Sequence, residues 1–413
     1  MYFAKYLREF GWEPIIYTPL NPDFELKDVS LQKEIPSDLC VIKRPIFEPY
    51  ALYKKLLGQK ELTVGQQIWK EDTKLKTSQK LITWIRGNFF IPDPRKFWIK
   101  PSVRFLKSYI QKEKIDLIIS TGPPHSMHVI GLKLKRTLGI PWIADFRDPW
   151  TQLVYFNKLK LSPSSRKAHH KLESSVIAEA DRITTVGSQL LNDFMTINHQ
   201  RDSSKFRIIY NGFDQIHQAR TTANENFTIC YTGRLAALQN PTNLWIALGL
   251  LVKENHEFAQ KLKINLVGEI DTVVLEDIQS NDLKPYLNHK GYVSHQEAID
   301  LQQDADLLLL MLFKNHDSRG ILTGKIFEYL ATHHFILAFG TPGGDVDTIL
   351  QETKSGIIYP FDTDIQLIKQ QIQQRFNLHP SNLALDGNAI NTYSRRNQCK
   401  QLASICDELV KSY

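Results

Sequence analysis

The sequence predicts an α/β protein built from two doubly wound, Rossmann-like domains that face a cleft. Short apolar runs alternate with longer helical patterns, which is typical of parallel sheets whose strands are connected by helices. The alternation occurs twice along 413 residues, a length for which two domains of ~100–200 residues are the first expectation. A polar segment between the two sets, DQIHQARTTANEN (214–226), has neither pattern and is typical of a linker.

Composition places the chain among ordinary globular proteins. Charged residues make up 23% and hydrophobic residues 42% of the sequence, as in folded domains and unlike disordered chains. The formal net charge of +7 favours anionic partners, which include nucleotides, phosphorylated substrates, anionic membrane surfaces and nucleic acid. The charge alone does not choose among them.

Cysteine usage and hydropathy indicate a cytoplasmic protein. The four cysteines are scattered without a CxxC pair, so neither a disulfide framework nor a zinc site is expected, and a reducing cytosol fits. Apolar runs such as ADLLLLMLF (305–313) are far shorter than the ~20 residues of a membrane-spanning helix. The first residues, MYFAKYLREFGW, form an amphipathic pattern and lack the arrangement of a signal peptide.

In the first half of the chain, apolar runs bounded by turn residues predict six strands. We expect these strands at 14–18, 39–44, 116–121, 141–146, 182–186 and 206–210. Helical patterns lie between them, at 101–114, 125–138, 166–180 and 188–197. Residues 51–100, rich in lysine and aromatic residues, do not follow the alternation and are expected to form an insertion at the edge of the domain.

The second half repeats the alternation. Strands are expected at 227–233, 263–268, 289–293, 305–312, 335–340 and 356–360, and helices at 242–258, 295–303, 323–333, 345–354 and 364–377. The predicted domains are therefore 1–213, 214–393 and a C-terminal helix, 394–413, that packs back on the first domain.

Loops that follow the strands are the candidate sites, because ligands of open α/β sheets bind at the carboxyl ends of the strands. In STGPPHS (120–126), Gly122 permits close approach of the backbone, two prolines stiffen the turn, and Ser126 can cap the next helix. A rigid turn and a loop that lines a ligand are about equally well supported.

The loop ADFRDPW (144–150) brings Asp145, Arg147 and Asp148 to one strand end. Three charges there are costly to bury unless they are paired or functional. An Arg–Asp pair that holds the loop is one alternative. The position at a strand end favours function, because binding and catalytic residues concentrate on such loops.

Two further loops carry turn signals. In YNGFD (210–214), Asn211 and Gly212 predict a tight turn, which as a plain hinge needs no ligand. In YTGRL (231–235), Gly233 permits close approach and Arg234 presents a fork suited to phosphate oxygens. A simple surface arginine is the alternative for Arg234.

The stretch RGILTGKIFEYLA (319–331) follows a predicted strand. Thr323 can cap a helix that starts near Gly324, and the free N–H groups of a first turn can bind an anion. Lys325 adds positive charge, and Glu328 can accept hydrogen bonds from neutral hydroxyls of a sugar or ribose. The alternative is a solvated Lys325–Glu328 ion pair, because residues three apart share a helix face.

Together, in this order and spacing, TGKIFEYLA (323–331), YNGFD (210–214) and TGRL (232–235) resemble the retaining GT-B glycosyltransferases of the large family that uses nucleotide-activated sugars. The resemblance covers nearly the whole chain, and STGPPHS and ADFRDPW resemble one bacterial branch. It implies a hexosyltransferase-type enzyme that moves a sugar from a nucleotide-diphosphate sugar to a hydroxyl of a glycan or lipid-linked acceptor. Retention of anomeric configuration, bacterial cell-surface polysaccharide synthesis, and no metal or cofactor beyond the donor substrate are further implications.

The resemblance also implies roles for individual residues. Glu328 would hold the donor ribose, and Arg234 and Lys325 would clamp the diphosphate. Relatives place a catalytic-site histidine, often followed by aspartate, where this sequence has Arg147 and Asp148, which become the catalytic candidates. The backbone that meets the diphosphate would be Gly233, Leu322, Thr323 and Gly324, and the acceptor side or cleft would include Gly122, His125, Asp145 and Asn211.

This sequence departs from the family at three places. Gly320 stands where many relatives carry a first glutamate, and no lysine follows Arg234 in AALQN (236–240), so Lys325 would compensate. Relatives also begin with a strand before the helix that matches MYFAKYLREFGW. We therefore expect the first strand of the N-terminal domain to be absent, which leaves two strands without a partner and indicates an incomplete gene product or a misassigned start.

Other functions remain open from the sequence. An inactive glycosyltransferase-like protein or truncated gene product with a binding or scaffold role is the main alternative, and a nucleotide-sugar epimerase matches less well. Residues 95–114 mix basic and aromatic residues and are expected to allow peripheral contact with anionic lipid at the inner face of the membrane. A solvated helix whose apolar face packs inward is the alternative for that segment. No nucleic acid is expected.

Overall fold

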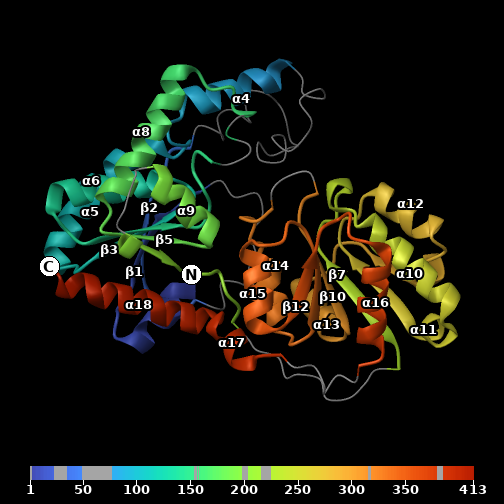
Figure 1. The fold of residues 1–413 in the computed structure, drawn as a ribbon. Helices are drawn as coiled ribbons and strands as arrows, with labels where there is room; N and C mark the ends of the chain where they lie inside the picture. Colours follow the sequence, from blue (N-terminus) through green and yellow to red (C-terminus); the bar gives the residue numbers. More distant parts are fainter. Residues whose placement is uncertain are drawn as a thin grey trace. The chain divides into compact units, whose positions relative to one another are not determined.

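The computed structural model describes two compact units (Figure 1). The described residues are 2–22, 35–48, 77–152, 156, 158–197, 203–214, 225–314, 318–378 and 385–413. The first unit consists of residues 1–210 together with 399–413, and the second of residues 211–398. Most of the expected linker, 214–226, and residues 51–76 of the expected insertion lie outside the described residues.

The N-terminal unit contains two parallel sheets. Strands β1 (Ile15–Pro19) and β2 (Cys40–Arg44) form one of them. The other has the order β3-β4-β5-β6, and its strands are β3 (Ile118–Gly122), β4 (Trp142–Phe146), β5 (Arg182–Thr185) and β6 (Phe206–Ile208). The strands predicted for this half are all present, with small shifts at their ends. The apolar runs of β4 and β5 are buried, as is typical of parallel sheets, whereas β1 is half-buried and most of β2 is exposed.

Among the described residues, β1 pairs only with β2, and β3 pairs only with β4. In this part of the chain, one edge of β1 and one edge of β3 therefore have no hydrogen-bonded neighbouring strand. A doubly wound sheet that lacks its central strand would be divided in this way. The absence of such a strand stays a prediction.

Seven helices of the described residues belong wholly or mostly to the N-terminal unit. They are α1 (Tyr2–Tyr6), α4 (Thr77–Phe89), α5 (Lys96–Glu113), α6 (Ser126–Leu138), α8 (Pro163–Glu179), α9 (Ser188–Ile197) and most of α18 (Arg395–Lys411). The prediction that α5 begins at Pro101 is wrong, because Pro101 lies inside the helix. Burial of Trp98 and Ile99 in the core stabilises the additional turn before it.

The two faces of β4 show how the core of this unit is divided. Trp142, Ala144 and Phe146 face a cluster that includes side chains of α6 and α8. Ile143 faces the other way and packs with Leu402 of α18. Since successive side chains of a strand point to opposite faces, the continuous apolar run of β4 serves both clusters. The last residues of the chain are thus part of the N-terminal core.

The C-terminal unit is a six-stranded parallel sheet in the order β12-β11-β10-β7-β8-β9. The strands are β7 (Phe227–Thr232), β8 (Leu262–Val267), β9 (Leu287–Lys290), β10 (Leu307–Met311), β11 (Phe335–Phe339) and β12 (Gly356–Tyr359). The chain runs outward from β7 through β8 and β9, and then returns to β10 on the opposite side of β7. The two outward directions meet between β7 and β10, which is the topological switch point of the sheet.

Eight helices connect and flank these strands in the described part of the unit. They are α10 (Thr242–Glu254), α11 (His256–Lys261), α12 (Thr272–Ser280), α13 (His295–Gln303), α14 (Gly324–Leu330), α15 (Asp345–Thr353), α16 (Ile365–Phe376) and α17 (Gly387–Thr392). The single helix predicted at 242–258 is wrong: it divides at Asn255, whose side chain accepts a hydrogen bond from the N–H of Phe258 and starts α11. Helices α12 and α17 were not predicted from the sequence.

Residues 211–213, which the sequence prediction assigned to the first domain, contact the C-terminal unit. Phe213 forms a parallel bridge with Ser394, and Asp214 pairs with Arg395 at 3.2 Å. Gly212 has a φ of 63°, and a Cβ there would lie 2.6 Å from the carbonyl oxygen of Tyr393. Contacts with the segment before α18 therefore fix this turn. In the described ranges, no helix combines the length and apolar character of a membrane span.

We predict that Leu402→Ala destabilises the N-terminal unit by about 2–5 kcal/mol, because Leu402 is fully buried in its core. Urea unfolding followed by tryptophan fluorescence measures the change, since only Trp245 of the seven tryptophans lies beyond residue 210. Exposed Gln401, its neighbour on α18, provides the control, and Gln401→Ala is expected to change stability by less than about 0.5 kcal/mol. Equal unfolding curves for the two variants would contradict the packing of α18 in this core.

Candidate functional site

The loops that follow β7 and β10 meet at the topological switch point of the C-terminal sheet. The two strands are neighbours, with Leu307 opposite Ile229 in the ladder. The loop after β7 contains Gly233 and Arg234, and the segment after β10 leads into α14 with Lys325 and Glu328. Ligands of open α/β sheets bind at this position. The structure thus brings together four of the residues that the sequence analysis selected for donor binding.

Lys325 is directed at the strand β7. Its Nζ donates a hydrogen bond of 2.9 Å to Oη of Tyr231 and lies 4.4 Å from the centroid of the Tyr231 ring. The Tyr231 hydroxyl in turn donates to the backbone oxygen of Arg234 at 2.6 Å. One buried phenol therefore links α14 to the loop after β7. Sequence reasoning missed Tyr231, although it directly precedes the TGRL motif.

Close approach of the Gly233 backbone makes this position of Lys325 possible. Gly233 has a φ of 112°, and a Cβ there would lie 2.6 Å from Lys325 Nζ. Gly268, at the end of the neighbouring strand β8, has a φ of 116°, and its Cβ would lie 2.4 Å from the Gly233 oxygen. Only glycine combines this backbone conformation with the absence of a side chain. Sequence reasoning gave no role to Gly268, whose only signal was its place at a strand end.

The Lys325 charge has no anionic partner in the described part of the chain. No carboxylate forms an ion pair with it there, and the predicted alternative of a Lys325–Glu328 surface pair is not formed. Burial lowers the pKa of Lys325 to about 8, although the charge of Glu328 acts in the opposite direction. A cation that is desolvated without an anion is an arrangement suited to an anionic ligand.

The start of α14 differs from the prediction in one respect. Thr323 occupies the N-cap position before Gly324, but its side chain accepts no capping hydrogen bond, and its Oγ1 is buried without a partner. The helix has seven residues, too few for a strong dipole, so Lys325 supplies the positive charge here. Leu322 is half-buried, whereas Gly324 and Glu328 are exposed. The Glu328 carboxylate is thus accessible to a ligand.

Arg234 lies at the surface of the C-terminal unit. Its guanidinium is 3.6 Å from Glu269, and the two side chains are 70% and 76% exposed. Exposed pairs of this kind contribute little, about 0–1 kcal/mol. A phosphate can therefore replace Glu269 as the partner of Arg234 at small cost.

In the N-terminal unit, the loops after β3 and β4 lie side by side. The N–H of Arg147 donates to the Gly122 oxygen at 2.9 Å. A Cβ at Gly122 would lie 2.5 Å from Nε2 of His128. His125 is buried and stacks on Trp150, with ring centroids 4.6 Å apart and an angle of 2° between the rings. Burial lowers the pKa of His125 well below its ordinary value, so its imidazole is neutral at pH 7.

Asp145 and Arg147 form the loop-holding pair that was one of the two predicted alternatives. Nε of Arg147 donates to the buried Asp145 carboxylate at 2.9 Å, and the hydroxyl of Thr184 donates to the same carboxylate at 2.6 Å. Arg147 also donates to the Ile209 oxygen at 3.0 Å. Asp148 is exposed, and desolvation by neighbouring atoms raises the pKa of its carboxyl. Of these three charged residues, Asp148 is the one directed to solvent.

Asn211 lies in the turn at the start of the C-terminal unit. Its side chain is exposed, and its backbone oxygen accepts a hydrogen bond of 3.4 Å from Arg395. Because Asn211 groups with the C-terminal unit, it does not share a unit with Gly122, His125 and Asp145. Its predicted role beside an acceptor stays a prediction.

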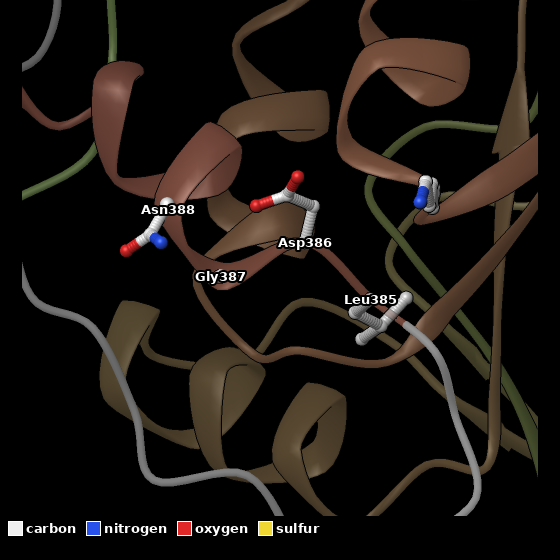
Figure 2. A pocket seen from close by; sticks show the side chains of 5 residues that line it. Leu385, Asp386, Gly387 and Asn388 are labelled. Carbon is white, nitrogen blue, oxygen red and sulfur yellow. The ribbon is translucent and has the colours of Figure 1, made fainter.

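An open hollow of about 390 Å³ lies elsewhere in the C-terminal unit, near α15 and α17 (Figure 2). It is lined by Lys354, Leu385, Asp386, Gly387 and Asn388. None of the predicted site residues lines it, and the Asp386 carboxylate already caps α17 by accepting from the N–H of Ala389. In the described ranges, no group of three or more His, Cys, Asp or Glu residues could hold a metal ion.

Comparison with known proteins agrees with this architecture. Residues 68–215 match the model of Glycosyltransferase Family 4. Among curated proteins, none matches the chain. The structure of HepE from Anabaena in complex with UDP-glucose is similar, with a TM-score of 0.56 and 14% identity, over 99% of this chain and 94% of that chain.

Two other proteins of known structure have a similar fold. Sucrose-phosphate synthase of Thermosynechococcus elongatus has a TM-score of 0.55 and 13% identity, over 100% of this chain and 92% of that chain. TarM of S. aureus has a TM-score of 0.51 and 15% identity, over 75% of this chain and 58% of that chain. At such identities the likeness establishes the fold. The chain has the GT-B fold, and this fold together with the match of residues 68–215 to Glycosyltransferase Family 4 supports its assignment as a glycosyltransferase enzyme.

Proposed function

We propose that this protein transfers a sugar from a nucleotide-diphosphate sugar to a hydroxyl acceptor, with retention of anomeric configuration, in the synthesis of a bacterial surface polysaccharide. The observation that carries the proposal is the Lys325 ammonium, which lies at the switch point of the C-terminal sheet without a carboxylate partner in the described residues. The diphosphate of a donor would supply the missing anion.

The donor would bind through residues of the C-terminal unit. Lys325 and Arg234 contact the diphosphate, and backbone groups of Gly233 and of residues 322–324 lie along it. Glu328 accepts hydrogen bonds from the ribose hydroxyls, for which its exposed carboxylate is suited. UDP-glucose is the first donor to test and UDP the first nucleotide ligand, because structures of HepE in complex with each are similar to this chain.

The acceptor would bind to the N-terminal unit, near Gly122, His125 and Asp145. In this proposal Arg147 has a positioning role, because its guanidinium is already paired with Asp145. Asp148 is the remaining catalytic candidate, since its carboxyl is exposed and has a raised pKa. The leaving diphosphate would assist removal of the acceptor proton, and Lys325 and Arg234 would stabilise its developing charge. The reaction in this form requires neither a metal nor a cofactor.

We also propose peripheral contact of the N-terminal unit with anionic membrane at the cytoplasmic face, where a lipid-linked acceptor would be available. Helix α5 packs Trp98, Ile99 and Ile110 inward, as expected for a solvated amphipathic helix. Several apolar side chains of this unit nevertheless remain exposed; they include Phe47, Leu81, Trp84, Phe89 and Phe97, among which Phe47 contacts Phe97 and Trp84 contacts Phe89. Lys96 Nζ lies 5.3 Å from the centroid of the Phe97 ring. Aromatic residues beside basic ones suit a lipid–water interface.

We predict that Glu328→Ala weakens UDP-glucose binding by about 1–3 kcal/mol, through loss of hydrogen bonds to the ribose. Isothermal titration calorimetry measures the dissociation constant. Exposed Glu276 on α12 provides a matched control, and Glu276→Ala is expected to leave the dissociation constant unchanged. Equal affinities of the wild type and Glu328→Ala would remove Glu328 from the donor site.

A second prediction concerns stereochemistry. With UDP-glucose, whose glucosyl group is the α anomer, a retaining enzyme releases α-glucose on donor hydrolysis or forms an α-glucoside with an acceptor. Proton NMR taken before mutarotation distinguishes the anomers of the released sugar. A β product in the first spectra would contradict retention while leaving glycosyl transfer intact.

A third prediction concerns the membrane. We expect the chain to float with vesicles that contain anionic phosphatidylglycerol and to remain unbound with neutral phosphatidylcholine vesicles. Replacing Phe89 and Phe97 by serine should reduce the bound fraction about tenfold or more, because each exposed phenyl ring buries apolar area worth about 1.5–3 kcal/mol in the interface. Exposed Leu238 and Val273 in the C-terminal unit provide the control pair for replacement by serine. Binding that is independent of lipid charge and of both phenylalanines would overturn the proposal.

A further inference from the structure

We propose that Tyr231 is a positioning residue of the donor site, whose hydroxyl holds the Lys325 ammonium where a donor phosphate binds. This inference rests on the proposed function, because it concerns the same site. Nothing in the sequence motifs assigns a role to Tyr231.

A hydroxyl is the group that this position requires. The Lys325 ammonium can only donate, and the Arg234 backbone oxygen can only accept. The Tyr231 hydroxyl has one proton, which it donates to the Arg234 oxygen at 2.6 Å. Its lone pair then accepts from Lys325 Nζ at 2.9 Å. A phenylalanine would keep the ring beneath the ammonium and lose both hydrogen bonds.

The position of the Tyr231 hydroxyl is fixed by the core. Tyr231 is fully buried and belongs to the apolar cluster of the C-terminal unit. Its strand β7 is held on both sides by β8 and β10. Lys325, in contrast, reaches its position through a flexible four-carbon side chain. Tyr231 is therefore the rigid member of the pair, and Lys325 is the member that needs to be held.

Holding Lys325 against β7 also keeps it away from Glu328. Residues three apart on a helix face each other and readily form an ion pair. Such a pair would neutralise the cation and occupy the carboxylate, which are the two groups that the donor requires. The hydrogen bond to Tyr231 selects the other direction for the Lys325 side chain, and the missing Cβ of Gly233 leaves room for it.

The surroundings of Lys325 are expected to make nucleotide binding depend on pH. Among the described residues, the titratable groups that act on Lys325 are Glu328 on its own helix and Tyr231 on β7. Burial raises the pKa of the Tyr231 phenol far above its ordinary value, so Tyr231 stays neutral. Burial lowers the pKa of Lys325 to about 8. Binding of an anionic nucleotide is therefore expected to be full below that pH and to weaken as the pH rises through it.

The experiment measures UDP affinity by calorimetry between about pH 7 and pH 9.5. We expect wild-type affinity to fall across this range, and Lys325→Met to bind weakly at every pH. Tyr231→Phe is expected to bind UDP about fivefold more weakly at pH 7.5, with its midpoint moved to lower pH, because a hydrogen bond to the charged amine is lost. Tyr359, half-buried on the edge strand β12, supplies the control Tyr359→Phe, which should match the wild type.

A double variant tests the part of the argument that concerns Glu328. Glu328→Gln keeps a hydrogen-bond acceptor and removes the charge that competes for Lys325. The affinity loss caused by Tyr231→Phe should therefore be smaller in the Glu328→Gln background than in the wild type. Equal losses in the two backgrounds would overturn the claim that Tyr231 keeps Lys325 away from Glu328.

The outcomes separate this inference from the proposed function. Absence of UDP binding by the wild type would contradict the donor site itself. Binding that depends on Lys325 and on pH, but is the same in Tyr231→Phe, would overturn the role of Tyr231 alone. A ¹³C NMR titration of the lysine amines in the wild-type chain needs no substitution at Tyr231. A Lys325 midpoint near the ordinary ~10.4 would likewise contradict a held, desolvated amine.

Discussion

The candidate donor site depends on one steric constraint, the close approach of the Gly233 backbone to two neighbouring groups. On one side, Gly268 at the end of β8 has no Cβ, which leaves space for the Gly233 oxygen. On the other side, the absence of a Cβ at Gly233 admits the Lys325 amine. The N–H of Gly233 is held by the Val267 oxygen at 2.7 Å. Any side chain at these two glycines would displace the loop or the lysine. The position of the Lys325 amine in the site therefore depends on how closely the ends of β7 and β8 pack.

Much of the fold could be predicted because its signals are local. Parallel strands buried on both faces are continuous apolar runs, and β4 and β10 are examples in which every residue is buried. The order of strands and helices then follows from alternation. The errors occurred where tertiary contacts decide: burial of Trp98 extends α5 before its proline, and the Asn255 cap divides one predicted helix into α10 and α11.

The site was predictable in its residue types but not in its contacts. Lys325 and Glu328 satisfy the local rule for an ion pair on a helix face, and that rule alone predicts the wrong partner. The partner of Lys325 is Tyr231, 94 residues away in the sequence, and only the adjacency of β7 and β10 brings them together. In the N-terminal unit the ion pair is local, because Arg147 pairs with Asp145 two residues before it in the same loop. A buried charge there has a partner within the loop, whereas at Lys325 the described structure provides a neutral hydroxyl.

This difference explains why one half-buried cation is structural and the other suits a ligand. Arg147 has Asp145 as its anionic partner, and Asp145 also accepts a hydrogen bond from Thr184, so the Arg147 charge is balanced without a substrate. Lys325 is desolvated beside a neutral phenol, and its lowered pKa, about 8, means that its charged form destabilises the free protein. Below that pH the charged Lys325 amine destabilises the folded protein to its full extent. Between about 8 and the ordinary ~10.4 the unfolded chain binds more protons than the folded one, so the cost declines as pH rises. A local destabilisation that an anion would relieve is expected at a binding site and is difficult to explain as a contribution to the fold.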